Sequence, residues 1–531
     1  MQRLAFLVLA LPLVPFAASA ATPSSDPDID CESAKPPKVD FDTHWATCRA
    51  RAAAARATSG TFAASAATDT VESTKTKVST LVTKAIYNSV PTWSDADILA
   101  QFPLQRDVRY MTVASDPSFL RRISWMYPDD GCFTRAEQFD VKVAQAGKTR
   151  PYKLFAFGNN LHVSTSNAEL GYVEWGYHVV AAVKNGAGEL IVFDGALSPC
   201  KPLPWKTWLA LMASDVSVFD TQGTNFYVSL GDSTAYVPTS LVTNEPSHAT
   251  ESLNGQQGTW LPNEWARQVG LGRDPSVVLG ASPPWSGFAC VNTEVVQVTT
   301  TLAPNTNGTA TATCPFATLV VGGGLAVNSS FAVSKNAKSG NGWQVAARNN
   351  SGSSQGFNAT AVCLTGAPTN ATVTTANGSV VSINPGSFAT STASCSSGTL
   401  VGGGFSTTQG ATSVMRIFSD QRTTSTGNTW QASAQNTTAS AKNVQSFAYC
   451  LNNASFTLNQ VSVVEDSAGV GFIQCSPKNS VGGGFAFPRT AAYSVDTMYA
   501  LGTQIYVVDM SGIPSSGDPN AKGFAQCLAH P

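Results

Sequence analysis

Three residues of types that can form a nucleophilic site occur in the order Cys132, His178 and Asp194. Cys132 follows the turn-forming residues 128–131 and precedes a stretch whose apolar positions have helical spacing. We therefore expect it in the first turn of a helix beginning near Phe133, where unpaired N–H groups and the helix dipole favour a thiolate. Such a thiolate would be a nucleophile. The alternative is one half of a disulfide or a buried thiol.

The histidine and the aspartate fall on a predicted β-hairpin. Residues 172–183 and 188–193 have the composition and alternation of strands, and turn-forming residues separate them. A turn centred near Gly186 places residue 178 opposite residue 194, give or take one, so we expect His178 and Asp194 to be cross-strand neighbours. An aspartate in that position would orient the imidazole and stabilise its charged form. A purely structural histidine is the alternative, but the cysteine upstream favours catalysis.

The motifs around these residues resemble those of protein-glutaminases, secreted bacterial enzymes that hydrolyse the side-chain amide of protein-bound glutamine. The shared segments are Tyr-Pro-Asp-Asp-Gly-Cys at 127–132, Arg-Ala at 135–136, Phe-Gly-Asn at 157–159, Ser-Thr at 164–165, Trp-Gly-Tyr-His-Val at 175–179, and Asp194. The resemblance covers roughly residues 91–238. It implies an α+β core similar to transglutaminases and papain-like enzymes, with Cys132 as nucleophile, His178 as base and acid, and Asp194 as orienting carboxylate. The family tends to have Pro-Ser-Leu where this chain has Gly-Ala-Leu at 195–197.

Four further residues are candidates for substrate binding: Asn159, Ser164, Trp175 and Tyr177. Loop polarity explains the first two equally well. Trp175 is three residues before His178, so an ideal strand places it on the opposite face, in the core or as an aromatic wall for the substrate. The sequence has no CxxC or HExxH pattern, so we predict neither a metal site nor a cofactor.

Composition and the first residues indicate an exported protein. The chain has 531 residues, of which 12% are charged, and a formal net charge of −2 without a basic stripe, which argues against nucleic acid as a partner. Residues 1–20 combine a basic start, an apolar run and Ala-Ser-Ala, as in a signal peptide, and no later stretch is apolar enough to span a membrane. We expect secretion to the periplasm or the medium. By the resemblance, residues 21–90 are a propeptide; a solvated spacer is the alternative.

The eleven cysteines leave one unpaired if the others form disulfides, in agreement with a free Cys132. The C-terminal region suggests three pairs from its internal similarity: Cys314 with Cys363, Cys395 with Cys450, and Cys475 with Cys527. Cys31 with Cys48 and Cys200 with Cys290 then follow only by elimination. Sequence alone leaves the connectivity open.

The C-terminal region contains three similar units, at about 293–366, 367–453 and 454–531, each with a Val-Gly-Gly-Gly segment between its two cysteines. Trp343 and Trp430 occupy matching places, and the third unit has no tryptophan there. Alternating Thr, Ser and Val predict an all-β region, built as a β-prism or trefoil-like array, or as tandem small β units. A catalytic domain at 91–245 and an extended linker at 246–292 would precede it.

The hypothesis is a secreted hydrolase that converts protein-bound glutamine to glutamate through a thioester, acting on proteins with exposed glutamine. A cysteine peptidase or a transglutaminase-like acyl transferase would use the same triad. A surface-binding or adhesin protein is the alternative from another class. Its function would lie in the repeats, and their ligand would be a glycan or a cell surface.

Overall fold

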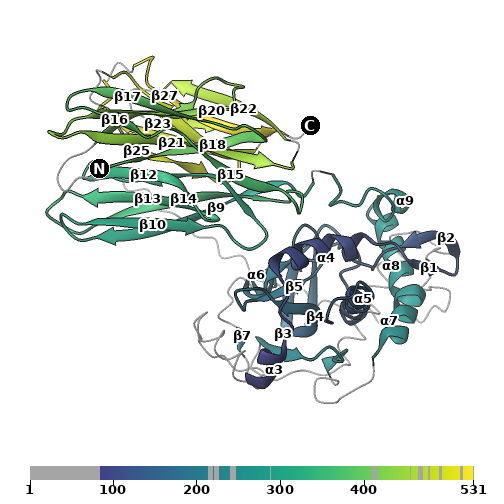
Figure 1. The fold of residues 1–531 in the computed structure, drawn as a ribbon. Coiled ribbons are helices and arrows are strands. Elements are labelled where there is room, and N and C mark those ends of the chain that lie inside the picture. The colour runs from purple at the N-terminus through teal and green to yellow at the C-terminus, as the bar shows by residue number, and fades with distance from the viewer. Residues whose placement is uncertain are drawn as a thin grey trace, which may run out of the picture.

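The computed structural model describes residues 84–212, 219–220, 226–238, 247–287, 289–408, 415–454, 456–464, 470–475, 479–489, 493–514 and 518–529. The expected signal peptide, Cys31, Cys48 and residues 21–83 of the expected propeptide lie outside them. The described chain forms a mixed helix-and-strand part followed by a large all-β part (Figure 1). Within the described residues, no helix is both long and apolar enough to cross a membrane.

The first part contains eight helical elements among the described residues. They are α3 (Lys84–Ser89), α4 (Asp95–Asp107), α5 (Cys132–Gln145), α6 (Trp205–Ala210), α7 (Ala249–Gly255), the π-helix η3 (Gln256–Trp260), α8 (Leu261–Gly270) and α9 (Pro275–Val278). Its strands are β1 (Met111–Val113), β2 (Asp116–Arg121), β3 (Tyr152–Ser164), β4 (Tyr172–Lys184), β5 (Leu190–Phe193), β6 (Leu203–Pro204), β7 (Phe219–Asp220) and β8 (Phe226–Gly231). A six-stranded sheet in the order β6-β5-β4-β3-β8-β7 forms its centre.

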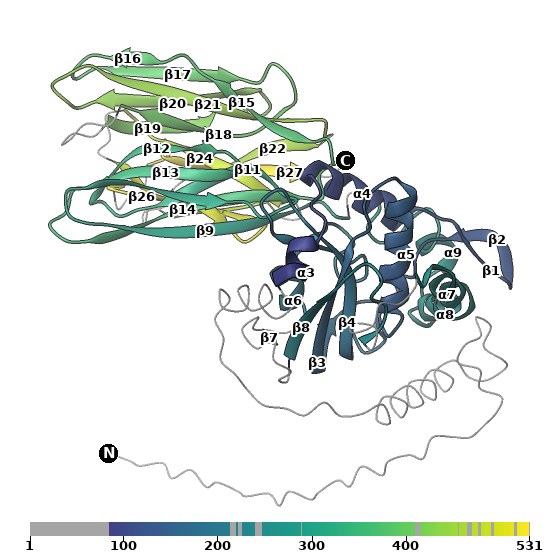
Figure 2. The ribbon, with the colours of Figure 1, turned by 60° about the horizontal axis from the view of Figure 1, so that its bottom comes forward.

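Helices cover both faces of this sheet (Figure 2). Ala181 and Val183 of β4 share one apolar cluster with Phe139 and Val143 of α5. The alternate residues of β4 belong to the cluster on the other face, which includes Trp208 of α6. Because both faces are buried, β4 and β5 are nearly continuous apolar runs.

The expected extended linker at 246–292 is wrong for most of its length. Residues 249–278 include α7, η3, α8 and α9, of which α7 packs against α5 and α9 packs against α8 (Figures 1 and 2). Short helices and a π-helical turn break the simple apolar periodicity, which is why the pattern looked irregular. Three tryptophans attach this segment to its neighbours. Trp260 stacks on Tyr127, Trp265 packs edge-on against Phe119, and Trp285 donates to Asp107.

The predicted hairpin exists, but its register differs from the expectation by two residues. Pairing runs from Ala181 with Phe193 to Lys184 with Leu190, so the loop contains residues 185–189 and is centred on Ala187. Asn185 accepts hydrogen bonds from the N–H groups of Ala187 and Glu189 and closes this longer loop. Position 194 is therefore in register with position 180, and Asp194 reaches His178 diagonally, just beyond the end of β5.

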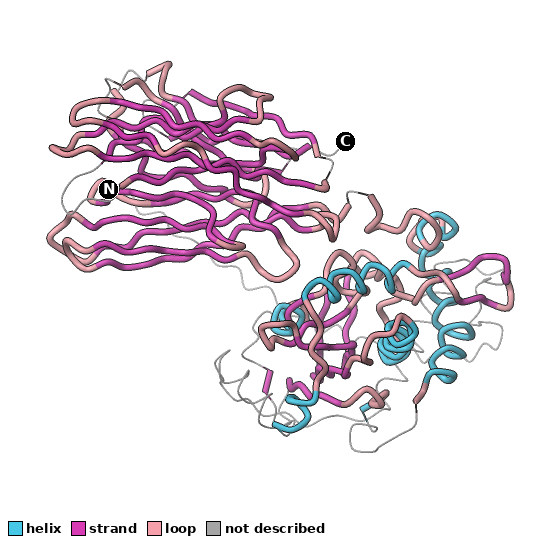
Figure 3. The backbone as a smooth tube through the Cα atoms, viewed as in Figure 1, coloured by secondary structure: helices cyan, strands magenta, loops and turns pink. Residues whose placement is uncertain are grey.

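The all-β part consists of three antiparallel sheets assembled alike (Figure 3). The first joins β10 (Asn307–Thr313), β13 (Gly342–Asn349) and β12 (Phe331–Ser339) to β18 (Thr399–Thr407), β21 (Lys442–Asn452), β15 (Thr372–Asn377) and β16 (Val381–Ile383). The second joins β17 (Phe388–Ser394), β20 (Thr429–Asn436) and β19 (Met415–Arg422) to β24 (Asn479–Ala486), β27 (Lys522–Ala529) and β22 (Thr457–Val464). The third joins β23 (Val470–Gln474), β26 (Ile505–Ser511) and β25 (Ser494–Leu501) to β11 (Leu319–Ala326), β14 (Gln355–Thr365) and β9 (Asn292–Leu302).

The three Gly-Gly-Gly segments lie on β11, β18 and β24, which meet at the centre of these sheets. A Cβ added to Gly322 would come within 2.1 Å of the Val481 carbonyl oxygen, and one added to Gly402 would come within 2.9 Å of that of Val321. One added to Gly482 would point at Val401, which completes a ring of three contacts. The strands approach so closely because they carry no side chains there.

Aromatic rings cover the second glycine of each segment. Trp343 lies on Gly323 and Trp430 lies on Gly403, while Tyr506 takes the place that lacks a tryptophan. The Tyr506 hydroxyl donates to the Gly323 carbonyl at 2.9 Å, so the third position still supplies a large ring with a polar end.

Four disulfides are present among the described cysteines. Cys314–Cys363, Cys395–Cys450 and Cys475–Cys527 cross-link the all-β part, and Cys200–Cys290 joins the mixed helix-and-strand part to the residues before β9. These are the pairs expected from the sequence. Lys201 also forms an ion pair with Glu294 of β9 at 3.0 Å, beside the last of these disulfides.

Candidate active site

Cys132 is the first residue of α5, as expected. It is the free cysteine of the described part of the chain, and 7% of its surface is exposed. Gly131 caps the helix in a left-handed conformation with φ of 78°, and the Trp260 ring lies where its Cβ would be. Since the cap has no side chain, nothing from the cap competes for the N–H groups of the first turn.

Helix α5 is anchored to the sheet by buried ionic contacts. The Lys153 ammonium of β3 lies 2.9 Å from Glu137 and 2.7 Å from Asp140, both on α5. Arg150 also pairs with Glu137 at 2.7 Å. Lys153, Glu137 and Asp140 are buried and Arg150 is partly exposed, and together these contacts fix the position of α5 relative to the strand that neighbours β4.

His178 and Asp194 are buried and in direct contact. The His178 Nε2 atom lies 2.8 Å from Asp194 Oδ2. The Trp208 indole also donates to this oxygen at 2.8 Å, and the Ala196 and Leu197 N–H groups donate to Oδ1. Every polar atom of the carboxylate therefore has a partner, which holds it in one orientation.

Two indole rings flank the imidazole. Trp175 stacks on His178 with ring centroids 4.4 Å apart, and Trp208 lies at 5.7 Å. The expected placement of Trp175 on the opposite face of β4 is wrong. Pairing of β3 with β4 is interrupted between Phe157 and Leu161, and beyond this irregularity Trp175 joins the apolar cluster that contains Val180. The Trp175 indole donates to the Pro128 carbonyl at 2.9 Å, which links this ring to the turn before Cys132.

The electrostatics favour a charged pair. Burial opposes the charged imidazolium, but the Asp194 charge, the hydrogen bond to Asp194 and the neighbouring Cys132 outweigh it and raise the pKa of His178 to about 9. Burial likewise opposes ionisation of Asp194, yet His178 and Trp208 hold the pKa of this carboxyl below its usual range. The second ring nitrogen, Nδ1, is buried and has no hydrogen-bond partner of ordinary geometry within the described residues. Since Nε2 is engaged by Asp194, Nδ1 is the atom available to the thiol.

The remaining candidates are distributed around this centre. Tyr177 packs against the apolar cluster that contains Cys132, and burial, together with the charge of Cys132, raises the pKa of its hydroxyl. Asn159 lies within the irregular segment of β3. Ser164 ends β3 and is exposed.

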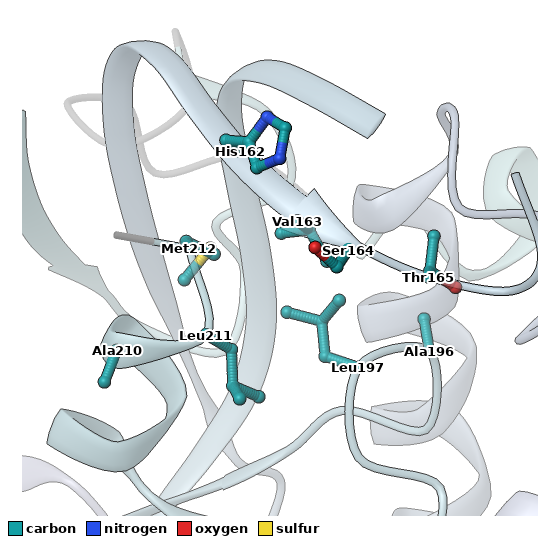
Figure 4. A pocket seen from close by; sticks show the side chains of 9 residues that line it. All are labelled: His162, Val163, Ser164, Thr165, Ala196, Leu197, Ala210, Leu211 and Met212. Atoms are coloured by element: carbon teal, nitrogen blue, oxygen red, sulfur yellow. The ribbon is translucent and has the colours of Figure 1, made fainter. Parts of the chain in front are cut away.

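Ser164 lines a cavity of about 540 Å³ beside the loop that follows Asp194. Figure 4 shows Ser164 and Thr165 facing Ala196 and Leu197, which follow Asp194. Leu211 and Met212 close the other side of the cavity, but none of its lining residues is Cys132, His178 or Asp194. The cavity therefore lies next to the loop that holds the carboxylate, rather than at the thiol itself.

The departure from the family pattern at Gly195 has a local cause. A Cβ there would come within 2.7 Å of the Trp125 ring, which donates to the Arg106 carbonyl and is buried. The loop can therefore pass the indole only as glycine, and it still directs two backbone N–H groups at Asp194.

Sequence reasoning missed two important residues, Trp208 and Trp260. Trp208 was not among the candidate residues, although its indole N–H donates to Asp194. Trp260 was assigned to a linker, although its ring covers Gly131. No local pattern marks either role, because each contact joins segments far apart in the sequence.

The arrangement is suited to nucleophilic attack by a thiolate. It has a thiol at a helix start, an imidazole whose pKa the thiol raises, and a buried carboxylate that fixes one ring nitrogen. Within the described residues, no group of three or more His, Cys, Asp and Glu side chains is placed to hold a metal ion.

Comparisons with known proteins agree with the expected resemblance. A family model described as a glutaminase matches residues 106–212, a segment that includes Cys132, His178 and Asp194. No curated protein sequence matches the chain significantly.

The similar solved structures include an A47Q2 mutant of pro-protein-glutaminase. It has 23% identity and a TM-score of 0.22, and the match covers 28% of this chain and 52% of the other. A structure of protein-glutaminase has 22% identity and a TM-score of 0.21, with 28% and 78% covered. An NMR structure of protein-glutaminase from Chryseobacterium proteolyticum has 22% identity and a TM-score of 0.21, with 28% and 77% covered. This chain thus spans about half the length of the first of these relatives.

Proposed function

We propose that this chain, whose residues 106–212 form an enzyme domain of the glutaminase family, deamidates glutamine side chains in proteins and releases ammonia. The observation that supports this most is the position of His178. Its Nε2 is held by Asp194, its other nitrogen is left for the Cys132 thiol, and all three residues lie in the family segment.

In the proposed reaction, the Cys132 sulfur attacks the carbon of the glutamine amide and forms a tetrahedral intermediate. His178, as an imidazolium, gives its proton to the departing nitrogen, so the C–N bond breaks and ammonia leaves. The resulting thioester is attacked by water, whose proton passes to His178. Glutamate then leaves, and its departure regenerates the thiolate–imidazolium pair.

The negative oxygen of the intermediate needs hydrogen-bond donors. We assign one donor to the backbone N–H of Cys132, because the first-turn N–H groups of α5 have no intrahelical partner and lie at the positive end of the helix. The Tyr177 hydroxyl is our candidate for the second donor, since this residue packs beside the thiol. Trp175, Asn159 and Ser164 remain candidates for substrate contact.

The remainder of the proposal concerns export and organisation. Four disulfides fit an oxidising compartment, in agreement with a signal peptide at 1–20 and secretion. We propose that residues 21–90 are a propeptide. We also propose that residues 293–531 are three repeats in a β-prism-like array, which would hold the enzyme near a wall, glycan or host surface.

The test is ammonia release from casein and from a short glutamine peptide by protein from which residues 21–90 have been removed by proteolysis, with Cys132→Ala as control. We expect ammonia from the wild type alone, intact peptide bonds, and the mass change of an amide converted to an acid. Cleaved peptide bonds would instead indicate a peptidase, and incorporation of an added amine would indicate an acyl transferase. Absence of all three products would contradict the proposal.

A further inference from the structure

The turn that carries the nucleophile is held by the helices between residues 249 and 278, outside the segment that matches the glutaminase family. The turn comprises residues 124–131, directly before Cys132. Gln256 of η3 accepts from the Ser124 N–H at 3.1 Å and donates to the Thr134 hydroxyl at 2.7 Å. One side chain thus joins the start of the turn to the first turn of α5.

Helix α8 holds the middle of the same turn. The Glu264 carboxylate accepts from the Met126 N–H at 2.7 Å, and the Gln268 amide donates to the Met126 carbonyl at 3.3 Å. Both polar groups of this one backbone residue are therefore bound by α8. Each of these side chains is buried, so each contact is shielded from water.

Arg267 of α8 links the nucleophile turn to the loop between β3 and β4. Its guanidinium binds the Asp129 carboxylate with two nitrogens, one of them 3.3 Å from Oδ1. The same group donates to the Asn167 carbonyl at 3.0 Å and lies over the Tyr127 ring at 5.4 Å. Asp129 is three residues before Cys132, whereas Asn167 lies in the loop between β3 and β4, the strand that carries His178.

We propose that Arg267 is a positioning residue, which sets the Cys132 thiol at the correct distance from His178 by tying the nucleophile turn to the β3–β4 loop. A guanidinium suits this role because its planar fork binds a carboxylate with two nitrogens while another N–H remains for a carbonyl. Lysine preserves the charge but offers no such fork. This inference concerns the site of the proposed deamidation and rests on that function for its kinetic test only.

The test compares Arg267→Lys with Arg273→Lys in the full chain. Arg273 is the matched control, because it binds Asn167 Oδ1 and the Ser166 carbonyl in the same loop. It reaches the nucleophile turn only indirectly, through its hydrogen bond to Gln268 at 3.0 Å. Two readouts are needed: the rate at which iodoacetamide alkylates Cys132 as a function of pH, located by peptide mass spectrometry, and kcat and KM for ammonia release.

We expect Arg267→Lys to lower both the alkylation rate at neutral pH and kcat by about 10–100-fold, as for a displaced reacting group, with KM within about twofold. Arg273→Lys should change each by less than about twofold. Equal effects of the two variants, or a lower melting temperature with normal alkylation and kcat, would overturn the proposal and make Arg267 merely structural.

Two further controls keep the outcomes distinguishable. If Arg267→Lys does not fold, Asp129→Asn replaces it, since this variant removes the charged partner and leaves Arg267 in place; an unchanged alkylation rate would then refute the inference. Alkylation does not depend on glutamine. If the wild type releases no ammonia but Arg267→Lys still slows alkylation of Cys132, the proposed function is refuted and the positioning role is supported. If the wild type releases ammonia and Arg267→Lys leaves the alkylation rate unchanged, the proposed function is supported and the positioning role is refuted.

Discussion

Replacing Asp194 with asparagine tests the proposed catalytic pair with almost no change in shape. Asp194 Oδ1 accepts from the Ala196 and Leu197 N–H groups, so the amide oxygen of the variant would keep these two bonds. The amide nitrogen would then face both His178 and the Trp208 N–H. Because it donates rather than accepts, it opposes Trp208 and forces Nε2 of His178 to accept, which places the ring proton on Nδ1.

The size of the effect follows from the pKa of His178. With the carboxylate in place this pKa is about 9, so nearly all of the imidazole is charged at pH 7.5. Without the carboxylate, only Cys132 still offsets burial, so the pKa falls towards the ordinary imidazole value of about 6.5, at which about a tenth is charged at pH 7.5. The wrong tautomer adds to this loss, and in a comparable triad the same substitution lowers kcat by about 10⁴-fold. We expect kcat for ammonia release to fall by about 10³–10⁴-fold.

The assay measures ammonia release and the pH profile of Cys132 alkylation for Asp194→Asn and for Trp208→Phe. Trp208→Phe removes one donor to Asp194 and retains the bond between Asp194 and His178, so its loss should be about tenfold, the value of one hydrogen bond to a charge. An Asp194→Asn enzyme that retains a tenth of its activity, or whose alkylation profile matches that of the wild type, would refute the charged pair.

Two predictions concern the all-β part. Asp420 is fully buried and burial raises its pKa to about 7, so the free energy of unfolding should fall by about 4 kcal/mol in total as pH rises from about 4 to 7. Asp420→Asn should remove this pH dependence in calorimetric scans, because an asparagine can accept from Trp430 as Asn336 accepts from Trp343. An unchanged pH dependence would contradict the assignment. A Cβ at Gly483 would lie 2.3 Å from Tyr506, whereas the nearest atom to one at Gly482 is 3.5 Å away, so Gly483→Ala should cost about 3 kcal/mol in urea unfolding and Gly482→Ala much less. Equal costs for the two would refute the close ring contact.

The residues of the proposed catalytic site could be picked out in the sequence because each is marked locally. Cys132 follows turn residues and begins a helical pattern, and the odd number of cysteines independently leaves one thiol free. The hairpin was also visible, but its register was not, since a turn centred on Ala187 rather than on Gly186 moves every pairing by two. Strand geometry also misplaced Trp175, because an irregularity in β3 changes which residues share a face.

Contacts between distant segments could not be read in this way. The three Val-Gly-Gly-Gly segments are visible in the sequence, and in the structure they lie in close contact with one another. No local sequence pattern, however, indicates that each sheet combines strands from different parts of the C-terminal region, as when β12 pairs with β18. Tyr506 likewise covers Gly483 as the two tryptophans cover Gly323 and Gly403, but no sequence pattern identifies it as their counterpart.

The start of α5 explains why the turn before it needs hydrogen bonds from distant residues. A serine or aspartate cap would stabilise the start of α5 by about 1 kcal/mol, but its oxygen would accept from the first-turn N–H groups. The proposed oxyanion site requires those N–H groups, and the cap here is Gly131, which makes no such bond. The turn must therefore be stabilised from elsewhere, and Gln256, Glu264 and Arg267 do so through its other polar atoms. A site that keeps its own helix end uncapped thus depends on residues more than a hundred positions away.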